Sequence, residues 1–372
     1  MSGTGQETRQ RIERETSRLL DAGVAGQVFP GAVACIAWRD GDGDIYVDVA
    51  SGFLRAGDAA VKTSTRYDLA SLTKPFVATA ALRLVAFGKL TLDVRTDAAL
   101  SDVRGGTGGS ATLRALLGHR AGLAAWGGLY LDVPHEPGTQ AARRWILSEA
   151  SRRSHDTWQK PPVYSDLGYI IAGEVVARSG GDKLDKVVAR EVTIPLGISE
   201  ELFYAASLPP DRRSQLAREA APTEWCEWRQ RFLRGEVQDE NCAAFGGVAG
   251  NAGMFGTARA VAAFGRAVLD VYAGRGDLLP RDLLMDALTS PDESTLLLGW
   301  EGKSPEESSA GRRMSPKSFG HLGFTGTSIW CDPERDVAVV LLTNRVHPSR
   351  ANERIKGFRP GFHDGVIAAL GK

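Results

Sequence analysis

The chain has 372 residues, enough for one large domain or two interleaved domains with a sizeable core. Hydrophobic residues make up 43% and charged residues 24%, while 45 Lys and Arg balance 45 Asp and Glu. This composition is typical of a soluble globular protein. It lacks the basic excess that nucleic-acid or acidic-membrane binding needs, so we expect neither kind of partner.

The N-terminal part predicts one helix and two strands. Apolar residues spaced among charges over residues 6–22 indicate an amphipathic helix. Strands are predicted over 32–38 and 44–50, with a Gly- and Asp-rich turn at 40–43 between them. The first 20 residues lack the apolar stretch of roughly 7–15 residues of a secretory signal. No run approaches the roughly 18 apolar residues of a membrane span, so we predict a cytoplasmic location.

The middle of the chain is mostly helical in pattern, and the C-terminal part returns to strands. A Gly-rich stretch at 105–109 and a polar stretch at 290–313 predict loops. Predicted helices cover residues 74–87, 113–117, 167–179, 258–272 and 365–370. Predicted C-terminal strands cover residues 328–331 and 337–343.

Strands near both ends of the chain, with helices between them, predict an α+β fold. One antiparallel sheet is built from both chain termini and flanked by helices, and a mostly helical domain is inserted into it. We expect residues 1–66 and 314–372 to form the sheet domain and residues 67–313 the helical domain. The active site is expected at the junction of the two.

The first candidate for chemistry is the S-x-x-K motif of Ser71 and Lys74. If a helix starts here, both side chains share one face. The helix N-terminus then places partial positive charge and free N–H groups near the serine oxygen. Pro75 agrees with a helix start, because the N–H it lacks would have had no partner. S-x-x-K alone is common enough to arise by chance, so a surface Ser and Lys remain the alternative at this point.

Two further polar motifs follow. Tyr164, Ser165 and Asp166 lie directly before the predicted helix at 167–179. Residues 320–326, which read G-H-L-G-F-T-G, open the first of the C-terminal strands. An S-x-x-K motif, a middle polar triad and a K-T-G strand, in this order, are the signature of active-site serine penicillin-binding enzymes.

With these motifs the sequence resembles the serine β-lactamase and penicillin-binding protein-like family, in the branch of class C β-lactamases and family VIII carboxylesterases. In that branch the middle motif is Y-x-N and the last one can be H-x-G. The resemblance covers nearly the whole chain and implies the β-lactamase/transpeptidase-like form of the α+β fold. Further segments that carry it are residues 116–123, 239–241 with 246–253, and 342–348.

The resemblance also implies a role for each matching residue. Ser71 is expected to be the acylated nucleophile and Tyr164 the general base. Lys74 is expected to keep the hydrogen-bond network of Tyr164, through which its proton moves, in place. The oxyanion hole is expected from the backbone N–H groups of Ser71 and Phe324. Free Lys and Tyr have pKa values near 10.4 and 10, so burial and proximity must supply about 4 kcal/mol to bring a base near neutrality. His119 is expected to brace a junction between a helix and a loop.

Two residues depart from the pattern of the family. Asp166 stands where Asn is usual, and an ionised Asp cannot donate to a substrate carbonyl but stabilises Lys74 as a cation. His321 stands where Lys begins K-T-G, and histidine is mostly neutral at pH 7. Both changes favour esters or neutral amides over β-lactams and D-Ala peptides that bear a carboxylate. Asp166, His321 and Gly323 are expected to support the substrate. Asn344 and Arg345 are expected to offer a remaining carboxylate contact from the next strand.

We therefore predict a serine hydrolase that acts through an acyl-enzyme, preferably on small esters. Three alternatives remain open: a β-lactamase or D-Ala peptidase/amidase, an acyltransferase, and a non-catalytic binding protein on the same scaffold. The expected partner is a small ester or amide substrate, with no nucleic acid and no membrane, and the oligomeric state is left open.

The remaining candidates for special chemistry are histidines and cysteines. His135, His155, His347 and His363 lack any ligand spacing, so we expect no metal and no cofactor. The cysteines lie far apart, without a C-x-x-C pair, and are expected to be reduced and mostly buried. One long-range disulfide among them stays open. They are Cys35, Cys226, Cys242 and Cys331.

Overall fold

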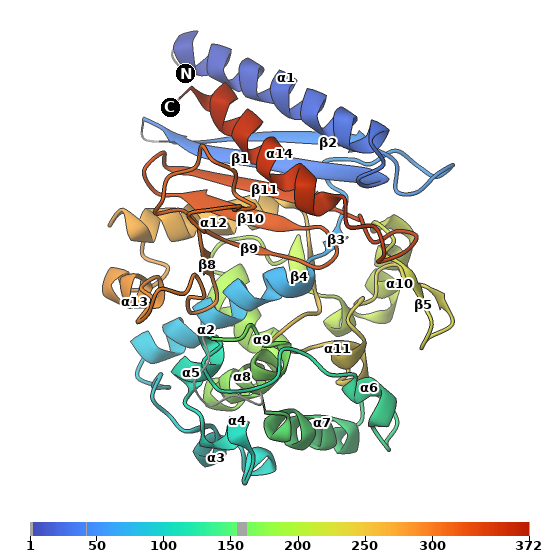
Figure 1. Cartoon of the computed structure of the whole chain (residues 1–372), viewed down its shortest axis with the longest axis vertical. Helices are drawn as coiled ribbons and strands as arrows, with labels where there is room; N and C mark the ends of the chain where they lie inside the picture. The colour runs from blue at the N-terminus through green and yellow to red at the C-terminus, as the bar shows by residue number, and fades with distance from the viewer. Residues whose placement is uncertain (1–2, 42, 155–161, 372) are drawn as a thin grey trace.

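The computed structural model describes residues 3–41, 43–154 and 162–371. Its main sheet has six strands in the order β2-β1-β11-β10-β9-β8, and every neighbouring pair for which a register is defined runs antiparallel. Strands from both ends of the chain thus share one sheet (Figure 1), which confirms the predicted fold class. The strands are β1 (Gly31–Asp40), β2 (Gly43–Gly52), β8 (Glu301–Gly302), β9 (Phe319–Leu322), β10 (Ser328–Asp332) and β11 (Val337–Thr343).

The two terminal helices pack together over one face of this sheet. α1 (Gly3–Ala25) contacts β2 and the C-terminal helix α14 (Ile355–Leu370) (Figure 1). The other face is covered by α12 (Ala258–Tyr272), which contacts β1, β10 and β11. Because both faces are covered, β11 is buried along its whole length and reads as one apolar run. Alternate side chains of β1 enter opposite apolar cores, Cys35 on the α12 side and Ile36 on the α1 side.

The chain between β2 and β8 is mostly helical and lies below the sheet in Figure 1. Its α-helices, besides α12, are α2 (Thr73–Ala86), α3 (Thr96–Ala99), α4 (Thr107–Ser110), α5 (Leu113–Leu117), α6 (Leu129–Asp132), α7 (Gln140–Arg152), α8 (Asp166–Gly180), α9 (Leu184–Val188), α10 (Pro210–Glu219), α11 (Glu240–Ala244) and α13 (Arg281–Ala287). Short helical turns of other types are η1 (Ala70–Leu72), η2 (Ser101–Val103), η3 (Ala189–Thr193) and η4 (Ala205–Ser207). Two small sheets join β3 (Tyr67–Asp68), β7 (Met254–Gly256) and β4 (Leu202–Tyr204), and β5 (Trp225–Cys226) with β6 (Arg231–Phe232).

Most predicted elements are confirmed, and four details were wrong. The Gly-rich stretch at 105–109 is not all loop, because α4 begins within it, and the polar stretch at 290–313 contains β8. Residues 319–322 form their own strand, β9, instead of opening the strand at 328. The last helix begins at Ile355, earlier than predicted. The first part of this helix was missed because Pro360, which lies inside it, is a residue that usually ends or kinks a helix.

The predicted division at residues 66 and 314 stays a prediction. α12 and β8 both come from the stretch assigned to the helical domain, yet α12 packs on the sheet and β8 is its last strand, paired with β9. The four cysteines are buried free thiols. Within the described ranges, no helix is long and apolar enough to cross a membrane.

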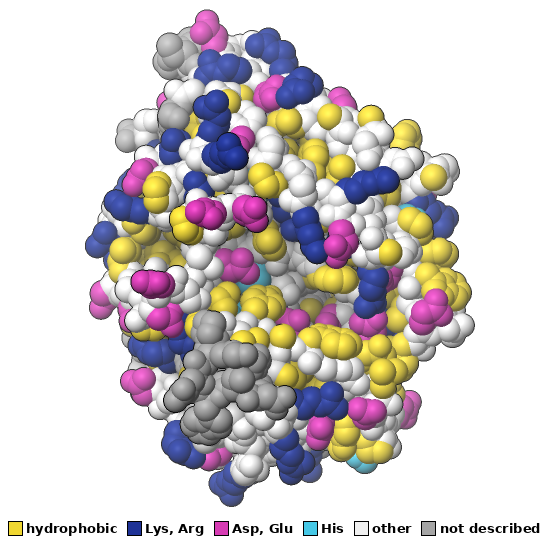
Figure 2. All heavy atoms as spheres, viewed as in Figure 1, with side chains coloured by type: hydrophobic (Ala, Val, Ile, Leu, Met, Phe, Trp, Pro, Cys, Tyr) yellow, Lys and Arg dark blue, Asp and Glu magenta, His cyan; other side chains and the backbone are white. Residues whose placement is uncertain are grey.

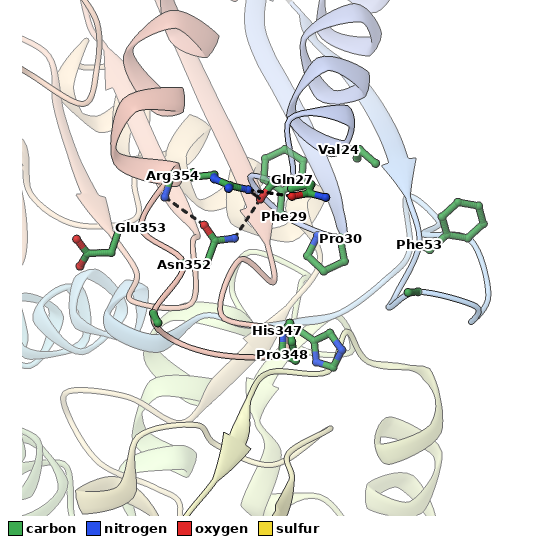
Figure 3. Close-up of a pocket in the computed structure, with 12 residues that line it drawn as sticks. Val24, Gln27, Phe29, Pro30, Phe53, His347, Pro348, Asn352, Glu353 and Arg354 are labelled. Carbon is green, nitrogen blue, oxygen red and sulfur yellow. Dashed lines mark hydrogen bonds between the residues drawn. The ribbon is translucent and has the colours of Figure 1, made fainter.

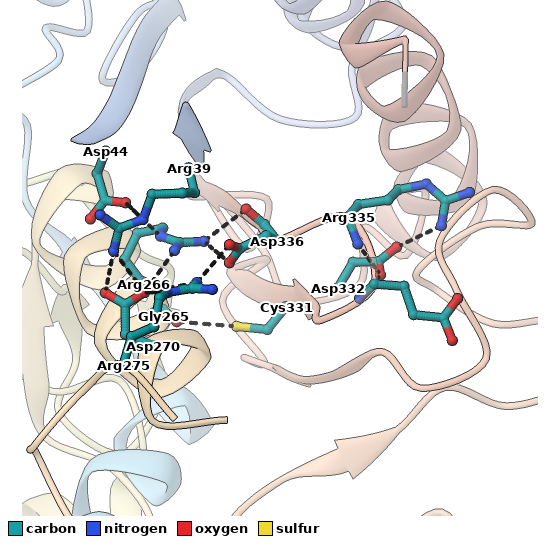
Figure 4. A network of polar contacts seen from close by, with 11 residues as sticks. Arg39, Asp44, Gly265, Arg266, Asp270, Arg275, Cys331, Asp332, Arg335 and Asp336 are labelled. Atoms are coloured by element: carbon teal, nitrogen blue, oxygen red, sulfur yellow. Dashed lines mark hydrogen bonds and ion pairs between the residues drawn. The ribbon is translucent and has the colours of Figure 1, made fainter. Parts of the chain in front are cut away.

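A network of arginines and aspartates fastens α12 to the sheet (Figure 4). Arg266 of α12 pairs with Asp44 of β2 at 3.2 Å, with Asp270 of its own helix at 3.1 Å, and with Asp336 between β10 and β11 at 2.8 Å. This ties three elements to one buried guanidinium. We call the whole set the Arg–Asp network, and its members are Arg39, Asp44, Arg266, Asp270, Arg275 and Asp336.

Candidate active site

Ser71 and Lys74 lie at the N-terminal end of α2. Ser71 is in the short turn η1, which continues directly into the helix, and Lys74 follows one turn later. Their spacing puts both side chains on one face, and Lys74 Nζ lies 2.8 Å from Ser71 Oγ. The structure thus brings together the two residues of the S-x-x-K motif at a helix N-terminus, where partial positive charge favours a developing anion.

The ammonium group of Lys74 is completely buried and donates three hydrogen bonds. It reaches Ser71 Oγ at 2.8 Å, Asp166 Oδ1 at 2.6 Å and the backbone oxygen of Asn251 at 3.3 Å. It also lies 4.9 Å from the centre of the Tyr164 ring. The structure therefore brings the side chain of Asp166 against the buried Lys74 nitrogen, as a charged hydrogen-bond partner.

Tyr164 lies beside these groups and forms a hydrogen bond with Ser71. Burial, followed by the charge of Asp166, raises the pKa of Tyr164 well above its usual value of 10, and the hydrogen bond with Ser71 opposes this only in part. A general base that works near neutral pH needs a pKa below the usual value of tyrosine. The direction at Tyr164 is the opposite, because burial penalises the charged phenolate. The resting side chain is therefore a neutral phenol.

His119 holds the segment that carries Tyr164 and Asp166. Its Nδ1 accepts a hydrogen bond of 2.9 Å from the backbone N–H of Ser165, and its ring stacks on that of Tyr164 at 4.5 Å. The Ser165 hydroxyl accepts from the N–H of Gly168 and so caps α8. His119 thus braces a loop against a helix, as predicted.

His321 and Gly323 bring the edge of the sheet to the site. His321 Nδ1 lies 2.9 Å from the backbone oxygen of Leu322, and burial lowers the pKa of His321 to about 3, so its ring is neutral. At Gly323 an added Cβ would lie 1.9 Å from Thr327 Oγ1 and 2.6 Å from the oxygen of Leu69. Only glycine permits this close approach of the two segments.

The backbone around Ser71 is strained and tied to the sheet edge. Ala70 has a φ of 47°, in the left-handed region that costs a non-glycine residue about 1–3 kcal/mol. Its N–H donates to Asp68 Oδ1 at 2.8 Å. Thr325, next to Phe324, donates its hydroxyl to the backbone oxygen of Asp68 at 2.8 Å. The segments that carry the two predicted oxyanion donors therefore lie side by side.

The predicted contact of Asn344 with a substrate carboxylate was wrong. The side chain is 1% exposed, and its amide donates to the backbone oxygens of Leu54 at 2.8 Å and Pro222 at 3.0 Å. Its neighbour Arg345 donates to the backbone oxygen of Phe324 at 2.6 Å. The side-chain N–H groups of both residues therefore donate to backbone oxygens of distant segments. The sequence does not reveal these contacts.

No role was predicted for Asp68, Asp239 or Asn251, although Asp239 and Asn251 lie in segments that carry the resemblance. Asn251 Nδ2 donates to Asp239 Oδ1 at 3.3 Å, and its backbone oxygen receives the Lys74 bond. Burial, together with the charge of Asp166, raises the pKa of Asp239 to about 6. The available signals were residues 239–241 and the Gly-rich stretch at 246–253, which carry the resemblance but indicate no partner for these side chains.

The face shown in Figure 2 is hollowed across its middle, between the sheet and the helical part, and apolar and acidic side chains line the hollow. Phe324, beside the site, is 45% exposed. A different cavity of about 830 Å³ is lined by residues of the α1–β1 loop, the segment after β2 and residues 347–354 (Figure 3). None of the predicted site residues is among those that line it. Within the described residues, no group of three or more His, Cys, Asp or Glu is arranged to hold a metal ion; His155 lies outside those residues.

Comparisons with known proteins show what this chain is similar to. A family model described as beta-lactamase matches residues 16–358. The N-acetylmuramyl-L-alanine amidase of Bacillus subtilis (strain 168) is 28% identical over 96% of this chain and 88% of its own length. A putative D-alanyl-D-alanine carboxypeptidase of Salmonella agona (strain SL483) is 27% identical over 90% and 84%. The solved structure of EstCE1, a hydrolase with promiscuous acyltransferase activity, covers 96% of this chain and 99% of its own at 18% identity and a TM-score of 0.75, which shows a shared fold.

Proposed function

The chain belongs to the beta-lactamase family, and from this premise we propose that it is a serine hydrolase that forms an acyl-enzyme on Ser71. The observation that carries the proposal is the position of Lys74, 2.8 Å from Ser71 Oγ and 2.6 Å from Asp166 Oδ1. A serine hydroxyl needs a neighbouring proton acceptor to attack a carbonyl. Three groups in one hydrogen-bonded line supply a route for that proton.

We assign the protons as follows. Lys74 passes one proton to Asp166 and, now neutral, takes the proton of Ser71 as its Oγ bonds to the substrate carbonyl carbon. Tyr164 is a neutral phenol, so it donates its proton to the leaving group and regains one from Lys74. In deacylation the same steps run in reverse, with water in place of the leaving group. The backbone N–H groups of Ser71 and Phe324 stabilise the oxyanion.

The preferred substrate in this proposal is a small neutral ester. Arg345, a cation that contacts Phe324, donates its hydrogen bonds to backbone oxygens, and so does the side-chain amide of Asn344. His321 is neutral and buried. A carboxylate on the substrate would therefore meet no free cation among these three residues. Burying such an unpaired charge costs free energy, whereas an uncharged acyl group carries no charge to be paired.

Amide hydrolysis is the second candidate. The observation in its favour is the relative from Bacillus subtilis, named an amidase, which matches 96% of this chain. An amide leaves as an amine and must be protonated as the bond breaks, and a neutral Tyr164 is suited to that donation. Esters depend less on this proton, so the two candidates differ in their need for Tyr164.

The test compares one acyl group as a p-nitrophenyl ester and as a p-nitroanilide, together with a chromogenic cephalosporin. We expect ester turnover in the wild type, a loss of at least about 10³-fold in Ser71→Ala, and no change in Ser110→Ala, an exposed serine control. Ser71→Ala should also resist labelling by a fluorophosphonate. Faster turnover of the anilide than of the ester would favour the amidase. Turnover of the cephalosporin alone would overturn the esterase. Faster breakdown of the acyl-enzyme when an alcohol is added would indicate acyl transfer. Full activity of Ser71→Ala, or an unlabelled and inactive wild type, would overturn the proposal as a whole.

A further inference from the structure

Asp68 is a buried carboxylate three residues before Ser71, at the end of β3. It is 1% exposed. Its Oδ1 accepts the backbone N–H of Ala70 at 2.8 Å, and its Oδ2 accepts the backbone N–H of Gln238 at 2.6 Å. A single side chain thus binds both the strained residue before Ser71 and the segment of Gln238, which lies 170 residues after Asp68 in the chain.

The backbone of the same segment is held from the sheet side. The hydroxyl of Thr325 donates to the oxygen of Asp68 at 2.8 Å, and that of Thr327 donates to the oxygen of Leu69 at 3.1 Å. Thr325 directly follows Phe324 in the chain. Asp68 therefore lies where the two segments with the predicted oxyanion donors are fastened to each other.

The second oxygen of Asp68 is linked to Lys74 through Gln238 and the residues that follow it. Gln238 precedes Asp239, whose Oδ1 accepts a hydrogen bond from Asn251, and the backbone oxygen of Asn251 accepts one from Lys74 at 3.3 Å. The Gln238 side chain is in turn fixed by Glu224 at 2.5 Å. Asp68 is thereby connected to all three parts of the candidate site: the nucleophile, the sheet edge and the lysine.

We propose that Asp68 is a positioning residue whose ionised carboxylate sets the distance between the backbone N–H groups of Ser71 and Phe324. It does not touch the substrate. A carboxylate can accept both N–H bonds with its charge spread over two oxygens, whereas an amide has one oxygen and would turn its NH₂ group toward the other N–H. The inference rests on the proposed function, because it assigns Asp68 to the oxyanion hole of that reaction.

The surroundings of Asp68 make its charge sensitive to pH. Burial raises the pKa of Asp68 to about 7, the hydrogen bonds from Ala70 and Gln238 lower it, and the charge of Asp239 adds to the rise while Arg229 opposes it. The thiol of Cys242 also faces this carboxylate. As pH falls below about 7 the carboxyl gains a proton, both N–H bonds weaken, and kcat should fall.

Asp68→Asn tests the inference, with Asp332→Asn as a matched control. Asp332 is also fully buried and accepts the backbone N–H of Ser315 at 2.8 Å and its hydroxyl at 2.7 Å (Figure 4 shows Asp332), but it lies outside the site. We expect Asp68→Asn to lower kcat by about 10²-fold, the cost of a small displacement of reacting groups. KM should stay within about twofold, and the loss of activity between pH 8 and 6 should disappear. Asp332→Asn should lower Tm without changing kcat or the pH profile of folded enzyme.

The inference is overturned if folded Asp68→Asn keeps the wild-type kcat, if only KM changes, or if the acid limb near pH 7 persists. If Asp68→Asn does not fold, Thr325→Val decides, because it removes the hydroxyl bond to the same segment. We expect this variant to lower kcat by about tenfold, and an unchanged kcat would overturn the inference. Ser71→Ala separates the two proposals: if it is inactive while Asp68→Asn is fully active, only the role of Asp68 fails.

Discussion

Two clusters of charge, the Arg–Asp network around the buried Arg266 and the group around the buried Lys74, differ in how completely each charge is paired. In the network Arg266 contacts three aspartates, and each of these also contacts a second arginine. Lys74 contacts one carboxylate, that of Asp166, and another of its hydrogen bonds goes to the uncharged oxygen of Ser71. Charges that pair with one another hold secondary structure together. A charge shared with a hydroxyl is placed to move a proton.

Lys74→Met should give the largest effect on this comparison. The substitution keeps most of the side-chain volume but removes the proton acceptor, so we expect kcat for the ester to fall by about 10³–10⁴-fold. The measurement is active-site-titrated turnover of a p-nitrophenyl ester. Lys303→Met is the control, because Lys303 donates to the backbone oxygen of Met314 at 2.6 Å and lies outside the site. An equal loss in both variants would contradict a special role of Lys74.

Arg266→Met should show the converse behaviour. Removing the arginine takes away the fully buried partner of three aspartates, each of which keeps a second, partly exposed arginine. We therefore expect the free energy of unfolding to fall by about 3 kcal/mol, the lower end for breaking a buried ion pair. The kcat of the folded enzyme should not change. Urea unfolding and ester turnover on the same sample measure both quantities.

The matched control for this prediction is Arg275→Met. Arg275 joins the same network through Asp270 and Asp336, but its side chain is 42% exposed. Solvent screens such pairs, so we expect a loss of at most about 1 kcal/mol. If Arg266→Met lowered kcat while leaving stability intact, the division of the two clusters into a structural and a reactive one would be wrong.

The two clusters also show what the sequence can reveal. The pairing of Ser71 with Lys74 was predictable, because a separation of three residues on a helix is a local relation. The approach of Asp166 to Lys74 followed only from the order of motifs, since 92 residues separate them. The Arg–Asp network was not predicted at all, because its members come from three distant segments and no periodicity links them.

Burial explains the remaining errors at the site. The pKa of Tyr164 was expected to fall, and it rises because the side chain is enclosed in the folded protein. Asn344 was expected to meet substrate, yet its amide is used by backbone oxygens of Leu54 and Pro222. Asp68 was missed for the same reason, since its partners are backbone N–H groups that any sequence would supply. Sequence shows which side chains exist, and the fold decides which of their donors and acceptors remain free.

Asp166→Asn should have the smallest effect of these variants, and it sharpens the comparison of the Lys74 group with the Arg–Asp network. It makes the charge of Lys74 still less completely paired, because an amide replaces the carboxylate that lies 2.6 Å from its nitrogen. We expect ester kcat/KM to stay within about tenfold, because the amide oxygen still accepts a hydrogen bond from Lys74 and water can take the Lys74 proton that Asp166 accepts in the wild type. The new amide can donate to a substrate carbonyl, so the ratio of cephalosporin to ester turnover should rise. Asp166→Ala removes the charge without adding a donor and should leave that ratio unchanged. If both variants raised the ratio equally, the charge of Asp166, and not the missing amide donor, would be what disfavours β-lactams.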